Sequence, residues 1–463
     1  MRKAARQRAF RFSIPAGTIM DSLQNDLTKG PILQQLIVFS LPLMAANILQ
    51  LLYSTVDMFV VSRIVGSSGL AAVSNGNRFG YLISSLCIGF SVGGTVIAAR
   101  YFATGDTRAQ KDTVGTLFSL SLILAGLVTM LSLALYKPLL SLMDVPAEAM
   151  PDAVAYTRII CAGTVFVFGY NTVCAILRGF GNSKSPLYFV AVATVVNIVL
   201  DIILVGPLGM GTKGAAVATV VSQGVSFGAA VAHLRKHSFV FDFKPRSFSI
   251  KPDKLAMILR IGLPSSAQLV VVNLSFLIIT GMLNPYGVAV AAASGIGLKI
   301  NTLAGMPCWA IGQAMTAMVA QNYGAGDITR VRQIAVTGLK VNLAVTIVIV
   351  AAVQLFARPL IMLFDPGNTE VIDIGVHYLR ICCSFNCVLY VTMYCFDSFA
   401  LGVGRPKVAL FNSLLDALVA KLALSWLAAV ILGMGYTGVY LGQALSALIP
   451  AMIGVLFFYR GWK

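Results

Sequence analysis

The same apolar pattern occurs twice in this chain of 463 residues. Pro42, preceded by Phe39-Ser40-Leu41, is matched by Pro264, preceded by Ile261-Gly262-Leu263, at an offset of 222 positions (264 − 42). Further matches follow at nearly the same offset: Gly105-Asp106 with Gly326-Asp327, Arg158-Ile159-Ile160-Cys161 with Arg380-Ile381-Cys382-Cys383, and Gly209-Met210-Gly211 with Gly433-Met434-Gly435. A duplicated chain is expected to fold as two similar units that face each other.

The composition places both units in a lipid bilayer. Hydrophobic residues make up 58% of the chain and charged residues only 11%, which is too little polar surface for a soluble protein of this length. A spanning helix needs about 20 mostly apolar residues, and period-2 alternation typical of barrel strands is absent. Twelve suitable stretches lie near residues 34–61, 71–99, 114–135, 153–176, 187–206, 214–234, 258–281, 289–320, 336–356, 375–399, 408–430 and 438–458.

These stretches predict an all-α integral membrane protein with twelve transmembrane helices in two pseudo-symmetric six-helix bundles. The first bundle is expected over residues 30–235 and the second over 256–463, with a linker at 236–255 and an N-terminal tail at 1–29. Because six is an even number, both bundles insert in the same orientation, as in transporters with parallel repeats. Residues 1–19 are basic and have no apolar core of a signal peptide.

The distribution of basic residues explains the net charge of +17. With twelve spans, 24 Lys and Arg residues fall at the side of the termini and the even-numbered loops, against four at the other side. This asymmetry is the positive-inside pattern. It predicts a multi-pass protein of the plasma (inner) membrane with both termini and the linker in the cytoplasm, and it removes the reason to expect nucleic acid as a partner.

No cofactor is indicated by the sequence. All eight cysteines lie in apolar segments, where a thiol behaves as a small apolar group, and no nearby histidine or acid completes a metal site around Cys382, Cys383 and Cys387. The HExxH and GxSxG motifs and nucleotide-binding loops are also absent. The chain is therefore not expected to be an enzyme, and a membrane-embedded enzyme is only a remote alternative.

Four carboxylates fall inside predicted spans: Asp57, Asp201, Asp397 and Asp416. A carboxylate in the bilayer costs roughly 2.5–3.5 kcal/mol, so each needs a partner, a cavity or a proton. A buried structural role is the alternative for each of them.

The repeat separates these acids from the scaffold. The counterpart of Asp57 at the offset of 222 is Ile279, and an ungapped count aligns Asp201 with Lys421. Positions that repeat are interpreted as scaffold, whereas the unrepeated Asp57 and Asp201 mark the first bundle as the place of ion chemistry.

Neutral oxygen atoms are expected around this acid pair. Asn197 precedes Asp201 by four residues, so both project from one face of a helix. Asn171 on the preceding span and Thr219 on the following span offer further oxygens. Such a set suits Na⁺, but two carboxylates held close together away from water could instead bind H⁺. Both readings make the site a coupling device, and the sequence leaves them open.

The order and spacing of several motifs resemble those of the multidrug and toxic compound extrusion (MATE) antiporters. The resemblance begins near residue 30 and covers nearly the whole remaining chain. It is carried by Leu41-Pro42, Val56-Asp57-Met58-Phe59-Val60-Val61 with Gly66, Leu70-Ala71-Ala72-Val73, Leu177-Arg178-Gly179-Phe180-Gly181-Asn182, Asn197-Ile198-Val199-Leu200-Asp201 and Gly214-Ala215-Ala216-Val217-Ala218-Thr219.

The resemblance implies specific roles for some of these residues. In the prokaryotic branch of the family, a cation site in the first bundle has positions that are filled here by Asp57, Asn171, Asn197, Asp201 and Thr219. The family's first helix bends, and Pro42 is the matching kink because proline removes a backbone hydrogen bond. A related branch carries an acid on the seventh helix, but this chain has Gln268 and Asn273 there, so no cation site is expected in the second bundle.

The predicted function is a cation-coupled (H⁺ or Na⁺) antiporter that exports organic, cationic compounds and acts as a monomer. Aromatic rings attract cations and methionine adapts to varied shapes, which selects a substrate cleft of Tyr53, Met306, Trp309, Met315, Tyr390, Met393 and Tyr394. The alternative is a flippase for lipid-linked oligosaccharide precursors. A flippase would require a strongly basic cavity, whereas the intramembrane bases are few and repeat between the halves, as Arg78 does with Lys299.

Overall fold

The computed structural model describes residues 23–142, 145–237 and 239–460. In this part of the chain the regular structure is helical, without strands. Residues 1–22 of the predicted N-terminal tail and the C-terminal residues 461–463 lie outside the described residues.

The first bundle, called the N-lobe, contains the first seven helices: α1 (Ile32–Ile64), α2 (Ser67–Ala103), α3 (Thr107–Leu142), α4 (Met150–Ala162), α5 (Thr164–Gly179), α6 (Lys184–Val205) and α7 (Gly211–Lys236). A short 3₁₀ turn, η1 (Pro245–Ser247), lies in the linker.

The second bundle, called the C-lobe, contains α8 (Pro252–Leu283), η2 (Asn284–Tyr286), α9 (Val288–Gly324), α10 (Ile328–Leu355), α11 (Ala357–Met362), α12 (Thr369–Cys382), α13 (Phe385–Gly402), α14 (Pro406–Leu414), η3 (Leu415–Ala420), α15 (Lys421–Trp426), η4 (Leu427–Ile431), α16 (Gly435–Leu445) and α17 (Leu448–Arg460). The elements η3 and η4 are π-helical.

The prediction of twelve spans is confirmed. Among the described residues, eleven helical segments are long and apolar enough to cross a membrane, and there are twelve when α4 and α5 count as one span bent by 46°. The C-lobe is interrupted at the corresponding place, between α12 and α13. The sequence reading missed both breaks because the apolar pattern continues through them.

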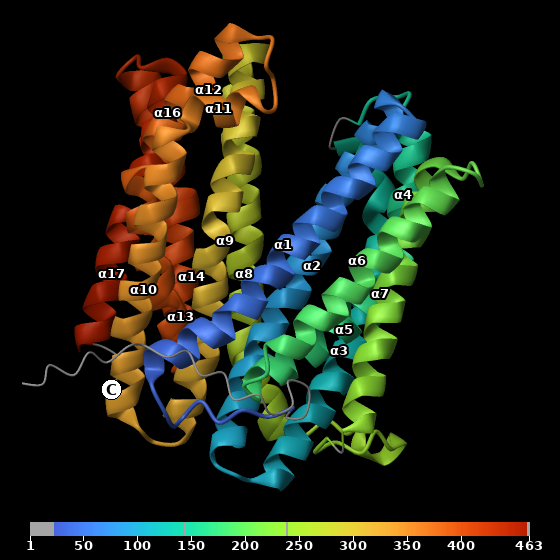
Figure 1. The fold of residues 1–463 in the computed structure, drawn as a ribbon, viewed down its shortest axis with the longest axis vertical. Coiled ribbons are helices and arrows are strands. Elements are labelled where there is room, and N and C mark those ends of the chain that lie inside the picture. The colour runs from blue at the N-terminus through green and yellow to red at the C-terminus, as the bar shows by residue number, and fades with distance from the viewer. Residues whose placement is uncertain (1–22, 143–144, 238, 461–463) are drawn as a thin grey trace, which may run out of the picture.

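The two lobes diverge toward one end of the molecule and meet at the other (Figure 1). At the joined end, α2 and α8 approach closely through glycine. A Cβ atom on Gly93 would lie 2.6 Å from the Ile258 carbonyl oxygen, and one on Gly89 would lie 2.3 Å from Ser266. The Asn273 amide also donates to Ser85 Oγ over 2.8 Å. Because a larger side chain would clash at both glycines, these residues permit the backbone contact.

The first helix of each lobe begins in the core of the other lobe. In α1, Leu36, Phe39 and Leu43 pack into a C-lobe cluster, whereas Val61 belongs to an N-lobe cluster. Figure 1 shows α1 crossing diagonally between the lobes. Pro42 therefore lies where α1 leaves the C-lobe.

The second copy repeats this crossing. Ile258 and Ile261 of α8 pack into an N-lobe cluster, whereas Ile279 and Leu283 belong to a C-lobe cluster. Pro264 lies between these two groups of contacts. The repeated prolines thus mark the points at which the lobes exchange their first helices.

Residues 23–30 are packed against both lobes at the joined end. The Asn25 amide donates to the Phe180 carbonyl of the N-lobe over 2.8 Å, and the Leu27 amide donates to Gln321 Oε1 of the C-lobe over 2.9 Å. Gln321 in turn donates to the Gly179 carbonyl over 2.8 Å. This part of the predicted tail connects the two lobes.

The two lobes differ in the fifth helix of each copy. In the N-lobe this span is the single helix α6, whereas the C-lobe places the two π-helices η3 and η4 within the corresponding stretch. Pro186 and Pro406, near the start of the span, are 220 positions apart, but Gly209 and Gly433, after it, are 224 apart. The C-lobe therefore accommodates four additional residues.

The added residues change which positions correspond. A Cβ atom on Gly214 would meet the Leu204 carbonyl carbon at 3.0 Å, and one on Gly438 would meet that of Ala428 at 2.5 Å. These equivalent contacts carry the offset of 224, which pairs Asp201 with Ser425. The ungapped alignment with Lys421 is wrong, because it ignores the π-helical insertions.

Candidate functional site

The two unrepeated acids come together inside the N-lobe. Asp57 of α1 is 2% exposed and Asp201 of α6 is fully buried. Their carboxylates interact electrostatically. Among the described residues, the ion pairs join Lys29 with Asp26, Lys254 with Asp253, Arg358 with Asp373 and Lys421 with Asp416, and none includes either acid. The acid pair thus lacks a protein counter-ion in the described structure.

Polar atoms around the pair are left without hydrogen-bond partners. They are Asp57 Oδ1, both carboxylate oxygens of Asp201, the side-chain oxygen and nitrogen of Asn197, and Thr219 Oγ1. Buried polar atoms are normally satisfied, and burial of unpaired carboxylates is costly. Hard oxygen donors of this kind fit Na⁺, and the carboxylates equally fit H⁺. Asp57, Asp201, Asn197 and Thr219 therefore present the donor atoms that a small cation would need, and their role as a cation site stays a prediction.

Tyr156 of α4 links several of these groups and was missed by the sequence reading. It is fully buried, its hydroxyl donates to Asn77 Oδ1 over 2.9 Å, and it interacts with Asp57 and Thr219. A hydroxyl placed between a carboxylate and neutral oxygens can hold the geometry of a small cation site.

The reason for missing Tyr156 is the repeat itself. Its counterpart, at the offset of 222, is Tyr378, so the rule that repeated positions are scaffold assigned it no role. Both rings pack on a glycine: a Cβ atom would lie 2.3 Å from the Tyr156 ring at Gly76 and 2.2 Å from the Tyr378 ring at Gly297. A repeated scaffold residue can therefore border a site present in only one copy.

Asn171 is hydrogen-bonded within its own helix, and Tyr53 interacts with the acid pair. The Asn171 amide donates to the Val167 carbonyl of its own helix over 2.9 Å, and no hydrogen bond in the described structure joins it to either acid. Tyr53 was assigned to the substrate cleft, but it interacts electrostatically with both Asp57 and Asp201. Tyr53 is thus placed beside the acid pair.

The other predicted cleft residues divide into two groups. Trp309, Tyr390 and Tyr394 are half-buried on α9 and α13; Trp309 Nε1 donates to the Tyr390 hydroxyl over 3.3 Å, and the two tyrosine rings stack at 6.0 Å. We call these three residues the aromatic ladder. In contrast, Met306, Met315 and Met393 are buried. Met315 packs against Gly338, where an added Cβ atom would lie only 2.3 Å from the Met315 Sδ.

Each buried acid of the C-lobe has one polar partner, although Asp397 Oδ2 has none. Asp397 Oδ1 accepts a hydrogen bond from Asn412 Nδ2 over 2.7 Å, and Asp416 Oδ2 pairs with Lys421 Nζ at 3.3 Å. The π-helix η3 carries the second pair, because its i→i+5 turn brings Asp416 and Lys421 together. The sequence reading had no signal for this pair, since five residues are out of register on an ordinary α-helix.

Comparisons with known proteins agree with this architecture. The MatE family model matches the chain twice, at residues 42–203 and 264–427, which together exceed half of its length. The probable multidrug resistance protein YpnP of Bacillus subtilis is 28% identical over 445 residues, covering 95% of this chain and 97% of the relative. A FAD transporter of Shewanella oneidensis is 25% identical and covers 78% of this chain and 81% of its own length.

A solved structure shares the whole two-lobed fold. It is described as the outward-facing conformation of a multidrug resistance MATE family transporter, with a TM-score of 0.88 and 25% identity over 94% of this chain and 96% of that one. These relatives are transporters rather than enzymes. The chain therefore belongs to the MatE family and is a multidrug efflux transporter embedded in the membrane.

Proposed function

We propose that this transporter exports organic cations in exchange for H⁺ or Na⁺ that enters at Asp57 and Asp201. The observation that carries the proposal is the buried pair of acids with unsatisfied oxygens on Asp57, Asp201, Asn197 and Thr219. A site of this kind gains most from a small cation, because the cation removes both the charge repulsion and the unmet hydrogen-bonding capacity.

The helix that holds Asp57 can transmit cation binding to the other lobe. Asp57 lies in the N-lobe half of α1, whereas Leu36 and Phe39 of the same helix pack in the C-lobe. Neutralising the acid pair removes the repulsion between the carboxylates, which lets α1 and α6 approach. Pro42 supplies a point at which α1 can bend, because proline already lacks one backbone hydrogen bond there. A ligand that favours one arrangement of the lobes thereby changes the affinity for a ligand that favours the other.

The orientation proposed for the membrane follows the charges. The end at which α1 begins and α17 ends is the basic end, and positive charge is retained in the cytoplasm. If the chain lies in the inner membrane with its basic end toward the cytoplasm, the lobes in Figure 1 are joined on the cytoplasmic side and diverge toward the outside. We propose that this arrangement is the one from which substrate is released.

The aromatic ladder of Trp309, Tyr390 and Tyr394 is the proposed contact for the substrate. Half-buried aromatic faces attract organic cations by cation–π interaction and accept rings of varied shape. Tyr53, beside the acid pair, is proposed to sense the occupancy of both sites. The relative that transports FAD makes a flavin dinucleotide a necessary comparison compound.

Transport by the purified full chain in liposomes tests the proposal. Liposomes are loaded with excess H⁺ or excess Na⁺, and uptake of ethidium is compared with uptake of the flavin dinucleotide. We expect one of the two gradients to drive ethidium uptake through the unmodified protein. Uptake through Asp57→Asn and Asp201→Asn should fall to the level of empty liposomes.

Asp397→Asn is the matched control, because it neutralises a buried carboxylate of the other lobe whose partner is a neutral amide. It should retain most of the uptake. Wild-type uptake by Asp57→Asn under both gradients would show that the acid pair does not couple transport. Preference for the flavin dinucleotide over ethidium would show that the proposed substrate class is wrong.

A further inference from the structure

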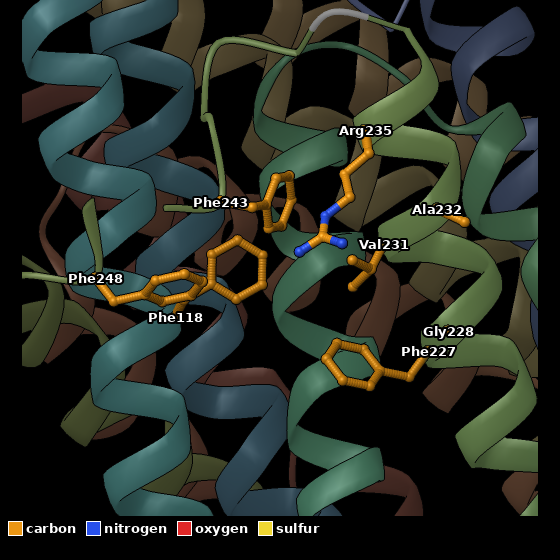
Figure 2. Close-up of a pocket in the computed structure, with 8 residues that line it drawn as sticks. All are labelled: Phe118, Phe227, Gly228, Val231, Ala232, Arg235, Phe243 and Phe248. Carbon is orange, nitrogen blue, oxygen red and sulfur yellow. The ribbon is translucent and has the colours of Figure 1, made fainter. Parts of the chain in front are cut away.

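A pocket lies in the N-lobe beside the linker, and neither Asp57 nor Asp201 lines it. It has a volume of about 600 Å³ and is lined by α3, α7 and the linker. Figure 2 shows the lining residues: Phe118, Phe227, Gly228, Val231, Ala232, Arg235, Phe243 and Phe248. Seven of these eight residues are apolar or glycine, and Arg235 is the single charged group.

The linker builds one wall of the pocket and is fixed to α3. The Lys251 amide donates to Thr116 Oγ1 over 3.1 Å, and a Cβ atom on Gly115 would lie 2.2 Å from the Ser247 carbonyl oxygen. The centroid of the Phe118 ring lies 5.7 Å from that of Phe243 and 5.9 Å from that of Phe248, so the three rings form one aromatic cluster. The wall is therefore part of the folded lobe.

Phe243 adopts an uncommon backbone conformation in this wall. Its φ angle is +53°, in the left-handed region that bulky residues rarely occupy. This conformation places the phenylalanine ring against the Arg235 guanidinium, whose central carbon is 5.3 Å from the ring centroid. Local strain of this type persists where the surrounding contacts favour it.

Arg235 provides the pocket with an uncompensated positive charge. Figure 2 shows its guanidinium among the apolar residues that line the pocket. The ion pairs found among the described residues do not include Arg235. The linker acid Asp242 accepts hydrogen bonds from Ser247 Oγ at 2.5 Å and from the Lys244 amide at 3.3 Å. Lys236, Lys244 and Arg246 add further positive charge at this end.

The depth of the pocket matches a lipid headgroup and the start of its acyl chain. Arg235 is the second-to-last residue of α7, and the lining extends back to Phe227, which is about 12 Å along a helix. Gly228 and Ala232 are exposed on the face of α7 that borders the pocket. The charged part thus lies at the end of the membrane span and the apolar part lies toward its middle.

We infer that this pocket binds an anionic glycerophospholipid of the leaflet next to the linker. Arg235 donates charge-assisted hydrogen bonds to the phosphodiester, and the phenylalanine rings with the open face at Gly228 take the first part of an acyl chain. Basic pockets at the ends of spanning helices favour anionic headgroups. The inference depends on the membrane location of the chain but not on the identity of the coupling ion or the exported compound.

Lipid binding to the full chain in detergent tests the inference. Native mass spectrometry or a fluorescence titration compares phosphatidylglycerol with phosphatidylcholine of the same acyl chains. We expect tighter binding of phosphatidylglycerol, and Arg235→Gln should weaken it about tenfold, as the loss of a charge-assisted hydrogen bond predicts. Arg235→Lys should restore part of the affinity because it keeps the charge.

Two further variants separate this pocket from general surface charge. Arg246→Gln removes a linker arginine that does not line the pocket, so it should leave phosphatidylglycerol binding unchanged. Gly228→Leu should lower the affinity for both lipids, because a Cβ atom there meets nothing within 4 Å and the longer side chain enters open space. If Arg235→Gln fails to fold, the lipid affinity of Gly228→Leu still tests whether the pocket binds lipid.

Three results would overturn the inference. They are equal binding of the two lipids, equal losses in Arg235→Gln and Arg246→Gln, and full lipid affinity in Gly228→Leu. Competition by soluble glycerol phosphate as strong as that by phosphatidylglycerol would also overturn it, because the ligand would then be a free phosphate rather than a lipid.

Discussion

The two lobes repeat one sequence pattern, but they place their buried acids in different surroundings. In the N-lobe, Asp57 and Asp201 interact electrostatically, and oxygens on both lack partners. In the C-lobe, Asp397 accepts from Asn412 and Asp416 pairs with Lys421. Asp416 thus has a counter-ion, whereas the two N-lobe acids have none among the described residues, and Asp397 keeps one oxygen, Oδ2, without a partner.

This contrast explains how a duplicated scaffold supports a single coupling site. The crossing of α1 and α8, the repeated prolines and the broken fourth span of each copy are shared. The chemistry differs because the C-lobe gains π-helical residues that pair Asp416 with Lys421. The shared features permit the lobes to move, and the unshared ones decide which lobe responds to a cation.

The largest effect is expected on removing the C-lobe counter-ion. Lys421→Met leaves Asp416 buried without its partner and should lower the free energy of unfolding by roughly 3 kcal/mol. Asp201→Asn should leave stability unchanged or raise it, because it removes an unpaired buried carboxylate. Thermal unfolding in one detergent measures both. A larger loss in Asp201→Asn than in Lys421→Met would reverse the comparison between the lobes.

The next effect concerns the contact between the lobes. Gly93→Val places methyl groups against the Ile258 carbonyl oxygen, where a Cβ atom already lies at 2.6 Å, and overpacking of this kind costs about 1–3 kcal/mol. The joined end should open, which spin labels at the exposed positions Thr104 and Ala325 would report as a longer distance.

Gly126→Val is the control for this measurement, because a Cβ atom at Gly126 meets nothing within 4 Å. The C-lobe counterpart of Gly93 is the buried Ala314, where a methyl group is already accommodated. An unchanged distance between the labels in Gly93→Val would contradict the close approach of α2 and α8.

A smaller effect is expected at the tyrosine that both copies share. Tyr156→Phe removes the hydroxyl that donates to Asn77 and interacts with Asp57. The loss of one hydrogen bond, about 1 kcal/mol, should raise the concentration of coupling ion needed for half-maximal uptake roughly fivefold. Tyr378→Phe should leave this concentration unchanged. Equal shifts in the two variants would show that Tyr156 acts only as scaffold.

The smallest effect is expected at the repeated prolines. Pro42→Ala restores a backbone donor within α1 and stiffens the helix that carries Asp57, so uptake should slow by a few-fold. Pro264→Ala acts on α8, where Ile279 replaces the acid, and should slow uptake less. Rates of ethidium uptake at saturating gradient compare the two. A stronger effect of Pro264→Ala would place the bending step in the C-lobe.

Much of the candidate site was predictable because its residues break a visible pattern. The i, i+4 spacing of Asn197 and Asp201 placed both on one helical face, and the absence of Asp57 and Asp201 from the second copy separated them from scaffold. The same reasoning failed for Tyr156, which repeats as Tyr378. Tyr53 was assigned to the substrate cleft for its aromatic ring, a prediction that stays untested, and the structure adds its interaction with Asp57 and Asp201.

The sequence by itself determined the membrane environment, the number of spans and the duplication, because apolar length and repeated motifs are local properties of the chain. Only the tertiary structure decided which polar groups meet. The exchange of α1 and α8 between lobes, the Asp416–Lys421 pair on a π-helix and the aromatic pocket around Arg235 depend on contacts between distant segments or on a helical period other than 3.6. The electrostatic interaction of the two N-lobe acids, and the Lys421 counter-ion of Asp416 in the C-lobe, are properties of packing that no single α-helix contains.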